Sequence, residues 1–306
     1  AYFDGKIATA ACARLATLAA KGEPFFLGVG FWKPHLPFNA PKKYWDLYDR
    51  AALRPPVTQR MPVGAPEIAG HAWNELRGYG GIPRAGPLAP ELIAELRHGY
   101  LASISFLDAQ VGRVLAELER LGLARNTMVV FWSDHGFHLG EHNLWGKTTN
   151  YELDTRVPLI VAAPGVTKGG GRTRALVELL DLYPTLAELC GLPAAAGVEG
   201  RSLVPVLREP QRPGKPVVIS QHPHPSYGPA THMGYALRTP RHRYVEWRDL
   251  KTGALAWREL YDELTDPNET VNQADNPEYR AAAADLGRQA AALAAASGRW
   301  PALSAR

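Results

Sequence analysis

The chain has 306 residues, of which 46% are hydrophobic and 21% are charged, and its formal net charge is +4 at pH 7. This composition is that of an ordinary globular protein with room for one large domain and a smaller one. It contains no basic run that would predict nucleic-acid binding, and no apolar stretch of the roughly 18 residues that a membrane span needs.

The first part of the chain predicts a helix, a buried strand, a long surface segment and a second helix. Residues 5–21 are rich in alanine, and Asp4 is the expected N-cap of that helix. The apolar run at 25–31 (FFLGVGF) predicts a buried strand. Residues 33–90 are rich in proline and glycine, which predicts an excursion over the surface. Hydrophobic residues at spacings of three and four then predict a helix over 91–121.

Helix and strand continue to alternate up to about residue 210. Residues 127–133 and 157–163 predict two further strands, so the expected fold class is α/β with a mainly parallel sheet. An Ala-rich helix is predicted at 278–297. Short strand-like segments that predict a small antiparallel sheet lie at 216–220, 234–238, 243–247 and 257–261. We therefore divide the chain into an α/β domain over 1–208 and a small α+β subdomain over 209–306.

An Asp and a His stand side by side where the strand at 127–133 ends. In open α/β sheets ligands gather at the carboxyl ends of the strands. Asp134 offers carboxylate oxygens and His135 a ring nitrogen, so the pair could fill two positions around a divalent cation. The alternative is a helix N-cap Asp followed by a hydrogen-bonded His.

Two further histidines follow, four residues apart. His138 and His142 have the spacing that places two imidazoles on one helix face, which is compatible with zinc. However, Gly140 argues against a firm helix, and the pattern is not His-Glu-x-x-His. We therefore favour structural histidines here.

Basic residues occur in two of the loops that leave strand ends. Lys33, His35 and Lys147 could neutralise an anionic ester, because lysine supplies compact charge and histidine can donate a proton. The alternative is a pair of solvated lysines and a loop histidine. Core packing is the default for tryptophan, but Trp145 lies close to Lys147 in sequence and could form the wall of a pocket.

The surface segment adds candidate substrate contacts. His71 and Trp73 lie within it and are the residues we select there.

Several segments together resemble the type I sulfatase family. The segment SDHGFHLGEHNLWGK (133–147) resembles its metal-and-lysine motif, and FFLGVGFWKPHLPF (25–38) resembles its Lys-Pro-His loop. The segment MGYALRTPRHRYVEW (233–247) is most similar to the iduronate-2-sulfatase branch and its bacterial relatives. Further similar segments are 103–123, 177–193, 199–207 and 259–272. The resemblance implies an alkaline-phosphatase-like fold.

The resemblance also implies roles for individual residues. Asp134 and His135 would be ligands of Ca²⁺, with Mn²⁺ or Mg²⁺ as alternatives. Lys147 would contact the sulfate group, and His35 would act near the leaving-group oxygen as proton donor or hydrogen-bond partner. Lys33 and Trp145 would shape the same pocket.

The nucleophile of the family has no match in this chain. Sulfatases use a formylglycine made from the cysteine of a Cys-x-Pro-x-Arg motif, and their remaining metal ligands are an Asp pair. Cys12 lies in CARLA, Cys190 lies in CGLPA, and no two aspartates are adjacent. We therefore expect the formylglycine and the missing N-terminal half of the same protein upstream of Ala1, and we expect this chain alone to be inactive.

The predicted function is that of a sulfatase fragment whose parent enzyme hydrolyses a sulfated small molecule or sulfated sugar. Two alternatives stay open: a phosphonate or phosphodiester hydrolase of the same superfamily, and a non-catalytic anion-binding module. The sequence does not distinguish a periplasmic, secreted or cytoplasmic location.

Overall fold

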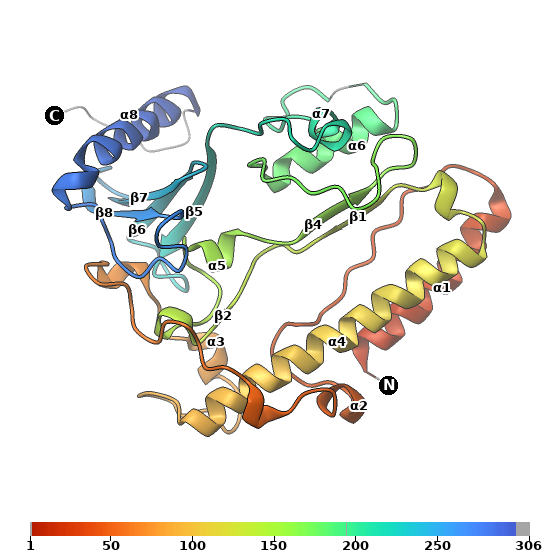
Figure 1. Cartoon of the computed structure of the whole chain (residues 1–306), viewed down its shortest axis with the longest axis horizontal. Coiled ribbons are helices and arrows are strands. Elements are labelled where there is room, and N and C mark those ends of the chain that lie inside the picture. The colour runs from red at the N-terminus through yellow and green to blue at the C-terminus, as the bar shows by residue number, and fades with distance from the viewer. Residues whose placement is uncertain (1, 194, 298–306) are drawn as a thin grey trace. The chain divides into compact units, whose positions relative to one another are not determined.

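The computed structural model of the chain describes residues 2–193 and 195–297 (Figure 1). The chain separates into two compact units, each formed by two stretches of sequence. Unit 1 comprises Ala1–Pro56 and Asn74–Val129, and unit 2 comprises Val57–Trp73 and Val130–Arg306. Among the described residues, no helix combines the length and the apolarity that crossing a membrane requires. The domain boundary expected after residue 208 stays a prediction.

Two long helices form the body of unit 1. Helix α1 (Phe3–Lys21) packs beside α4 (Pro90–Arg120), as Figure 1 shows. Small buried residues on both helices, such as Ala8 and Ala102, allow this close approach. The short helices α2 (Lys42–Trp45) and α3 (Asn74–Arg77) belong to the same unit. The helix predicted from alanine content at 5–21 and the helix predicted from hydrophobic spacing at 91–121 are thus confirmed.

Two local expectations in unit 1 are wrong. Residues 25–31 do not form a strand, because no other described strand pairs with them, although alternate side chains are exposed as in a strand. Asp4 is not the N-cap of α1, which is Tyr2. Instead the buried carboxylate of Asp4 accepts hydrogen bonds from the backbone N–H groups of Trp32 and Lys33, both at 2.9 Å. Those two bonds outweigh the capping preference and fix the end of the extended segment.

Unit 2 begins with two small sheets. Strands β1 (Val129–Trp132) and β4 (Leu159–Ala162) pair with each other, and β2 (His138–Leu139) forms an antiparallel pair with β3 (Trp145–Gly146). The expected mainly parallel sheet is thus represented in the described chain by β1 and β4 alone. The helices that accompany them are α5 (Glu152–Thr155), α6 (Leu182–Leu189) and α7 (Val204–Arg208).

A four-stranded antiparallel sheet and a helix form the second part of unit 2. The strand order is β5 (Val218–His224), β6 (His232–Arg238), β7 (His242–Asp249) and β8 (Leu255–Asp262). Helix α8 (Arg280–Ser297) lies against this sheet in Figure 1. Its alanines and Leu286 pack on Leu237, Tyr244 and Leu260, which are almost completely buried. The predicted antiparallel sheet and closing helix are confirmed.

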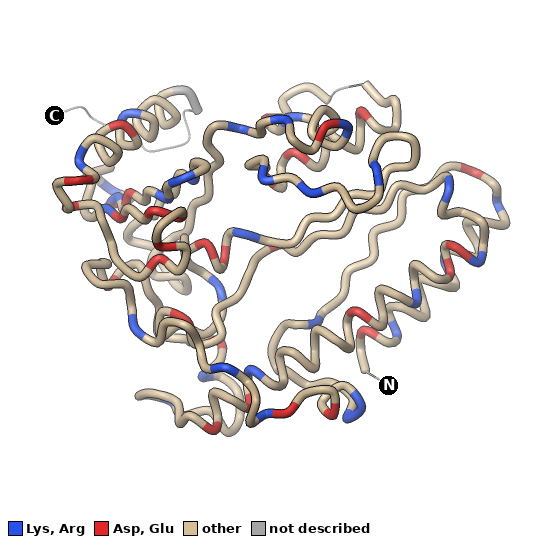
Figure 2. The backbone as a smooth tube through the Cα atoms, viewed as in Figure 1, with Lys and Arg blue, Asp and Glu red and all other residues tan. Residues whose placement is uncertain are grey.

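A buried network of charges connects this sheet to α5. Arg243 on β7 is 1% exposed and pairs with Glu152 of α5, with Glu269 at 2.6 Å and with Glu263 at 3.5 Å. Burial and neighbouring carboxylates raise the pKa of Glu263 to about 8, and burial raises the pKa of Glu269 to about 7. Figure 2 shows acidic and basic residues close together in this part of the chain. The pairing anchors α5 to the sheet.

Candidate active site

The loop at residues 133–149, called here the motif loop, starts where β1 ends. The Asp134 side chain is 83% exposed, and its Oδ2 lies 3.7 Å from Nε2 of His135. Nδ1 of His135 lies 2.8 Å from the carbonyl oxygen of Gly136, to which it donates. In the neutral imidazole this leaves the lone pair on Nε2, on the side of the Asp134 carboxylate. An oxygen donor and a nitrogen donor therefore stand together at the loop's start.

The position of this pair depends on Gly136. Its N–H donates to the carbonyl of Asp154 at 2.8 Å, and the N–H of Phe137 donates to the carbonyl of Leu153 at 3.0 Å. A Cβ atom at Gly136 would lie only 1.8 Å from the carbonyl oxygen of Leu153. Only glycine allows the two backbone segments to come this close.

His138 and His142 are buried and linked to each other and to protein acceptors. His138 Nδ1 lies 2.9 Å from Oδ1 of Asp154, and His138 Nε2 lies 3.4 Å from Nδ1 of His142. His142 Nε2 donates to the carbonyl of Asn268 at 2.7 Å. Burial lowers the pKa of His142. These contacts agree with the structural interpretation of the two histidines and not with a zinc pair.

The last part of the motif loop carries the second lysine of interest. Trp145 is buried, and Lys147 is partly buried. Thr148 has a left-handed backbone conformation with φ of 88°. The next residue, Thr149, donates to Oδ2 of Asp154 from its N–H at 2.9 Å and from its hydroxyl at 2.6 Å. The chain is therefore fixed two residues after Lys147.

The two candidate substrate contacts lie in the first stretch of unit 2. Trp73 is 6% exposed, and its indole N–H donates to the carbonyl of Asn143 in the motif loop at 2.7 Å. Its backbone N–H donates to Nδ1 of His71 at 3.1 Å. Both residues thus lie beside the motif loop, and Trp73 supports it. A direct contact with substrate stays a prediction.

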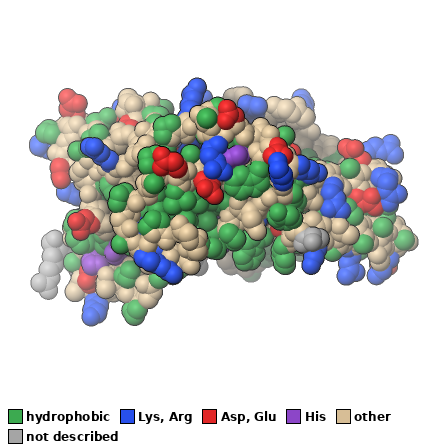
Figure 3. Space-filling model, turned by 90° about the horizontal axis from the view of Figure 1, so that it is seen from below, with side chains coloured by type: hydrophobic (Ala, Val, Ile, Leu, Met, Phe, Trp, Pro, Cys, Tyr) green, Lys and Arg blue, Asp and Glu red, His purple; other side chains and the backbone are tan. Residues whose placement is uncertain are grey.

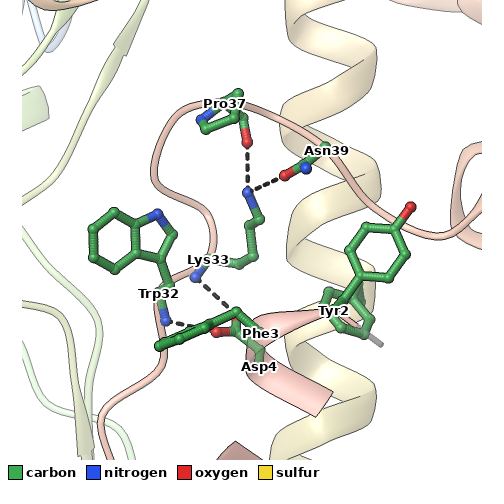
Figure 4. Close-up of a pocket in the computed structure, with 8 residues that line it drawn as sticks. Tyr2, Phe3, Asp4, Trp32, Lys33, Pro37 and Asn39 are labelled. Carbon is green, nitrogen blue, oxygen red and sulfur yellow. Dashed lines mark hydrogen bonds between the residues drawn. The ribbon is translucent and has the colours of Figure 1, made fainter. Parts of the chain in front are cut away.

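The lysine predicted in unit 1 has a different setting. The ammonium group of Lys33 donates to the carbonyl of Pro37 and to Oδ1 of Asn39 at 2.6 Å (Figure 4). It also donates to the carbonyl of His35 at 3.3 Å. Burial lowers the pKa of Lys33, and the carboxylate of Asp4 partly offsets this. The side chain borders a hollow of about 570 Å³ whose lining residues are Tyr2, Phe3, Asp4, Trp32, Lys33, Pro37, Asn39 and Phe106.

His35 faces a carboxylate within unit 1. Its Nε2 lies 2.9 Å from Oε1 of Glu75, and its Nδ1 lies 2.8 Å from the carbonyl of Leu36. The ring of Trp32 stands 5.1 Å from the imidazole, centroid to centroid. A proton on either ring nitrogen therefore has an oxygen acceptor beside it. The structure thus places six of the eight predicted residues in unit 2 and leaves Lys33 and His35 in unit 1, so the shared pocket that the resemblance implies stays a prediction.

Comparisons with known proteins identify the family. Residues 2–192 match the family model described as "Sulfatase", which is more than half of the chain. The chain belongs to the sulfatase family. Residues 140–296 also match a model described as "N-sulphoglucosamine sulphohydrolase, C-terminal". The resemblance inferred from the sequence motifs is thereby confirmed, within the alkaline phosphatase superfamily.

The curated sulfatase relatives are about twice as long as this chain. Human iduronate 2-sulfatase is 33% identical over 294 residues, covering 76% of this chain and 54% of the relative. A sulfatase of Formosa agariphila is 34% identical over 266 residues, covering 84% of this chain and 48% of the relative. The chain therefore spans about half the length of the curated relatives it matches.

Solved structures agree with the sulfatase fold. A protein solved in complex with its substrate D-glucosamine-2-N,6-O-disulfate superimposes with a TM-score of 0.82 at 20% identity, covering 99% of this chain and 72% of the other. The phosphonate monoester hydrolase of Silicibacter pomeroyi superimposes with a TM-score of 0.75 at 30% identity, covering 95% of this chain and 61% of the other. The predicted α/β, alkaline-phosphatase-like fold class is confirmed.

The residues of this sulfatase chain fit part of a cation site. Asp134 and His135 offer one oxygen and one nitrogen donor 3.7 Å apart. The hydrogen bond from Nδ1 of His135 to the carbonyl of Gly136 fixes the orientation of the ring, as the hydrogen bonds of metal-binding histidines commonly do. Among residues 2–193 and 195–297, however, no three His, Cys, Asp or Glu side chains are grouped so that they could hold a metal ion. Since Ca²⁺ takes six to eight ligands, the pair fits as two of them and further ligands are needed.

Three residues that hold the predicted site residues or their loops in place were not predicted from the sequence. Asp154 and Asn39 lie in segments without a recognisable motif, and Glu75 contacts His35 from 40 residues away. No local pattern marks such partners, because each is defined by a contact that only the folded chain creates. The one available signal was the run of polar residues after Lys147.

Proposed function

We propose that this chain supplies one part of the active site of a sulfuric ester hydrolase that acts on a sulfate ester of a sugar. The observation that carries the proposal is the Asp134–His135 pair at the end of β1, with the Asp134 carboxylate exposed, in a chain of the sulfatase family. A sugar substrate is supported by two relatives: iduronate 2-sulfatase, and the solved structure with D-glucosamine-2-N,6-O-disulfate.

Asp134 and His135 would hold a calcium ion, with manganese or magnesium as alternatives at the same position. A bound divalent cation supplies positive charge to the sulfate oxygens and so stabilises charge that develops during cleavage. The contribution of this chain is to keep the carboxylate and the imidazole oriented, through the hydrogen bond from His135 to Gly136 and the fit of Gly136 against Leu153.

Lys147 would contact the sulfate group as a point charge. Trp145 and Lys33 would shape the pocket, Lys33 by folding the loop that carries His35. His71 and Trp73 would contact the remainder of the substrate.

His35 would donate a proton to the leaving-group oxygen, or a hydrogen bond to it. The carboxylate of Glu75, 2.9 Å from Nε2, would stabilise a positively charged imidazole before that transfer. Glu75 would act through His35 and not on the substrate.

The nucleophile would be a formylglycine in a Cys-x-Pro-x-Arg motif upstream of Ala1, so the 306-residue chain alone would have no turnover. Three observations support this. The chain has no such motif and no adjacent aspartates, and it spans about half of its curated relatives. Large apolar side chains are also exposed, among them Phe26 at 86% and Ile160 at 62%, and Figure 3 shows hydrophobic surface between the charged groups on one face.

A second candidate is a phosphonate or phosphodiester hydrolase. It is supported by the structure of the phosphonate monoester hydrolase of Silicibacter pomeroyi, which is as similar in sequence as several of the sulfatase relatives. The Asp-His pair and the basic residues would serve either ester, since both carry anionic oxygens around a central atom.

The test starts with the reading frame upstream of Ala1. If it encodes an Asp pair and Cys-x-Pro-x-Arg, the whole product is assayed on an aryl sulfate, a sulfated amino sugar and an aryl phosphonate. We expect the sulfates to be the better substrates, and both Asp134→Asn and Lys147→Met to reduce kcat/KM by about 100-fold or more. A preference for the phosphonate supports the second candidate.

The isolated chain provides the complementary test. Metal-dependent release from an aryl sulfate by the pure 306-residue chain would contradict the upstream nucleophile. Binding of a sulfated sugar by that chain, with no upstream motif in the gene, would indicate a non-catalytic anion-binding module instead.

A further inference from the structure

One buried aspartate, Asp154, is bonded to both ends of the motif loop, to one end through its carboxylate and to the other through its backbone carbonyl. Oδ2 of Asp154 accepts two hydrogen bonds from Thr149, which lies two residues after Lys147. The backbone carbonyl of Asp154 accepts the N–H of Gly136, which directly follows His135. Gly136 and Thr149, which are thirteen positions apart in the loop, thus share a single partner.

The setting of the Asp154 side chain strengthens the two bonds that its carboxylate accepts from Thr149. The residue is 5% exposed, so water does not compete for its oxygens. Burial alone would raise the pKa of Asp154, but His138 and the bonds from Thr149 lower it below its ordinary value. An ionised acceptor in a dry site forms hydrogen bonds about twice as strong as neutral ones.

The side chain of Asp154 is itself fixed from the opposite side. Its Oδ1 accepts from Nδ1 of His138 at 2.9 Å, and His138 contacts His142, which donates to the carbonyl of Asn268. The N–H of His142 donates to the carbonyl of Thr58 at 2.9 Å. The chain of bonds therefore reaches two other segments of unit 2, and Asp154 cannot shift without breaking it.

We propose that Asp154 is the positioning residue that sets the spacing between the Asp134–His135 pair and Lys147. The inference rests on the proposed function for the meaning of that spacing, because a cation and a lysine must address the same sulfate group. Its geometry, however, lies entirely within unit 2 and can be examined whether or not the chain is active.

The test uses the complete 306-residue chain and two kinds of variant. Asp154→Asn keeps the size of the side chain and removes its charge, whereas Thr149→Val removes one donor and Thr149→Ser retains it. Asp249→Asn is the matched control: Asp249 is a partly exposed aspartate of unit 2 whose carboxylate also accepts three hydrogen bonds, from Lys251 and Thr252. Hydrogen exchange of loop peptides and the rate of Lys147 acylation, both measured by mass spectrometry, are the readouts.

We expect Asp154→Asn to speed exchange at both 135–138 and 147–150 by about fivefold or more, and to change the acylation rate of Lys147 severalfold, with no change in β5–β8. Thr149→Val, the milder variant, is expected to loosen both ends as well, since the ends share Asp154. Thr149→Ser is expected to restore wild-type behaviour.

The inference would be overturned if Thr149→Val speeds hydrogen exchange only at residues 147–150. It would also be overturned if Asp249→Asn speeds exchange in the motif loop as much as Asp154→Asn does. The catalytic proposal fails separately, if the whole gene product does not cleave sulfate esters. In an active product, Asp154→Asn is expected to lower kcat more than it raises KM, because misplaced groups bind the ground state but fail the transition state.

Discussion

The two lysines that match sulfatase motifs are held in opposite ways. In unit 1 the ammonium of Lys33 binds Pro37, Asn39 and His35 of its own loop, so the lysine folds the segment that carries it. In unit 2 the motif loop around Lys147 is fixed by residues outside it, above all Leu153 and Asp154. A motif lysine can therefore be a structural part of its loop or a group that the rest of the fold presents.

This difference predicts where each loop is sensitive. The loop at residues 33–39 should lose its conformation when its own lysine is removed. The motif loop should become more mobile when contacts outside it are removed. One such contact is the pair of Glu152 and Arg243, which attaches α5, the helix that carries Asp154, to the C-terminal sheet.

The largest effect is expected from Arg243→Met. Arg243 is buried and faces Glu152, Glu263 and Glu269. Its loss leaves Glu269 buried without a cation, whereas Arg238 remains beside Glu152 and Glu263. Breaking a buried ion pair from one side costs about 3–5 kcal/mol. We expect a loss of this size in the free energy of unfolding of unit 2 in urea titrations, with faster exchange in the motif loop.

Arg288→Met is the control for that variant. Arg288 pairs with Asp285 on α8 at 2.8 Å, but its side chain is 71% exposed. An exposed pair contributes about 0–1 kcal/mol. Similar losses from the two arginine variants would mean that burial of the network is not what anchors α5.

Lys33→Met should have a smaller and strictly local effect. The methionine retains the apolar stem but leaves the carbonyl of Pro37 and Oδ1 of Asn39 without their donor. We expect a loss of about 2–3 kcal/mol in unit 1 and no change in the exchange of the motif loop. Lys42→Met, which removes an 85% exposed lysine paired with Asp46 in the same unit, should be close to neutral. A stable Lys33→Met protein would contradict the structural role of the lysine.

Hydrophobic patterning was enough to predict the long helices, the antiparallel sheet and the strands β1 and β4. The run at 25–31 was apolar enough for a strand, but a strand also needs a partner, and pairing is not a local property. Asp4 shows the same limit, since a contact with residues 32 and 33 outweighed its capping preference. The motifs predicted the site residues, whereas Asp154 and Glu75 could not be found, because they act through contacts made only on folding.

The anchor of the motif loop should also respond to pH. The pKa of Glu263 is raised to about 8 and that of Glu269 to about 7, above the ordinary value of 4.5. Between about pH 4.5 and about pH 8, the folded chain therefore binds more protons than the unfolded chain does. The stabilisation is complete below about pH 4.5 and is lost as the pH rises through about 8.

We expect the free energy of unfolding of unit 2 to fall steadily between about pH 5 and about pH 8 in urea titrations. Glu263→Gln should flatten this slope, because its amide does not titrate. A stability that rises over the same range in the wild type would show that both carboxylates stay ionised beside Arg243 and Arg238.

The smallest expected effect concerns Trp73, which fastens the middle of the motif loop. Trp73→Phe retains a buried aromatic ring but removes the indole N–H that donates to the carbonyl of Asn143. Loss of one neutral hydrogen bond costs about 1 kcal/mol. Exchange should therefore increase about fivefold at residues 141–144 and stay unchanged at both ends of the loop, which Asp154 holds. Trp257→Phe, at a tryptophan that is 44% exposed, is the matched control. If Trp73→Phe also speeds hydrogen exchange at residues 135–138 and 147–150, the motif loop opens as one unit. Trp73 and Asp154 would then not hold separate parts of it.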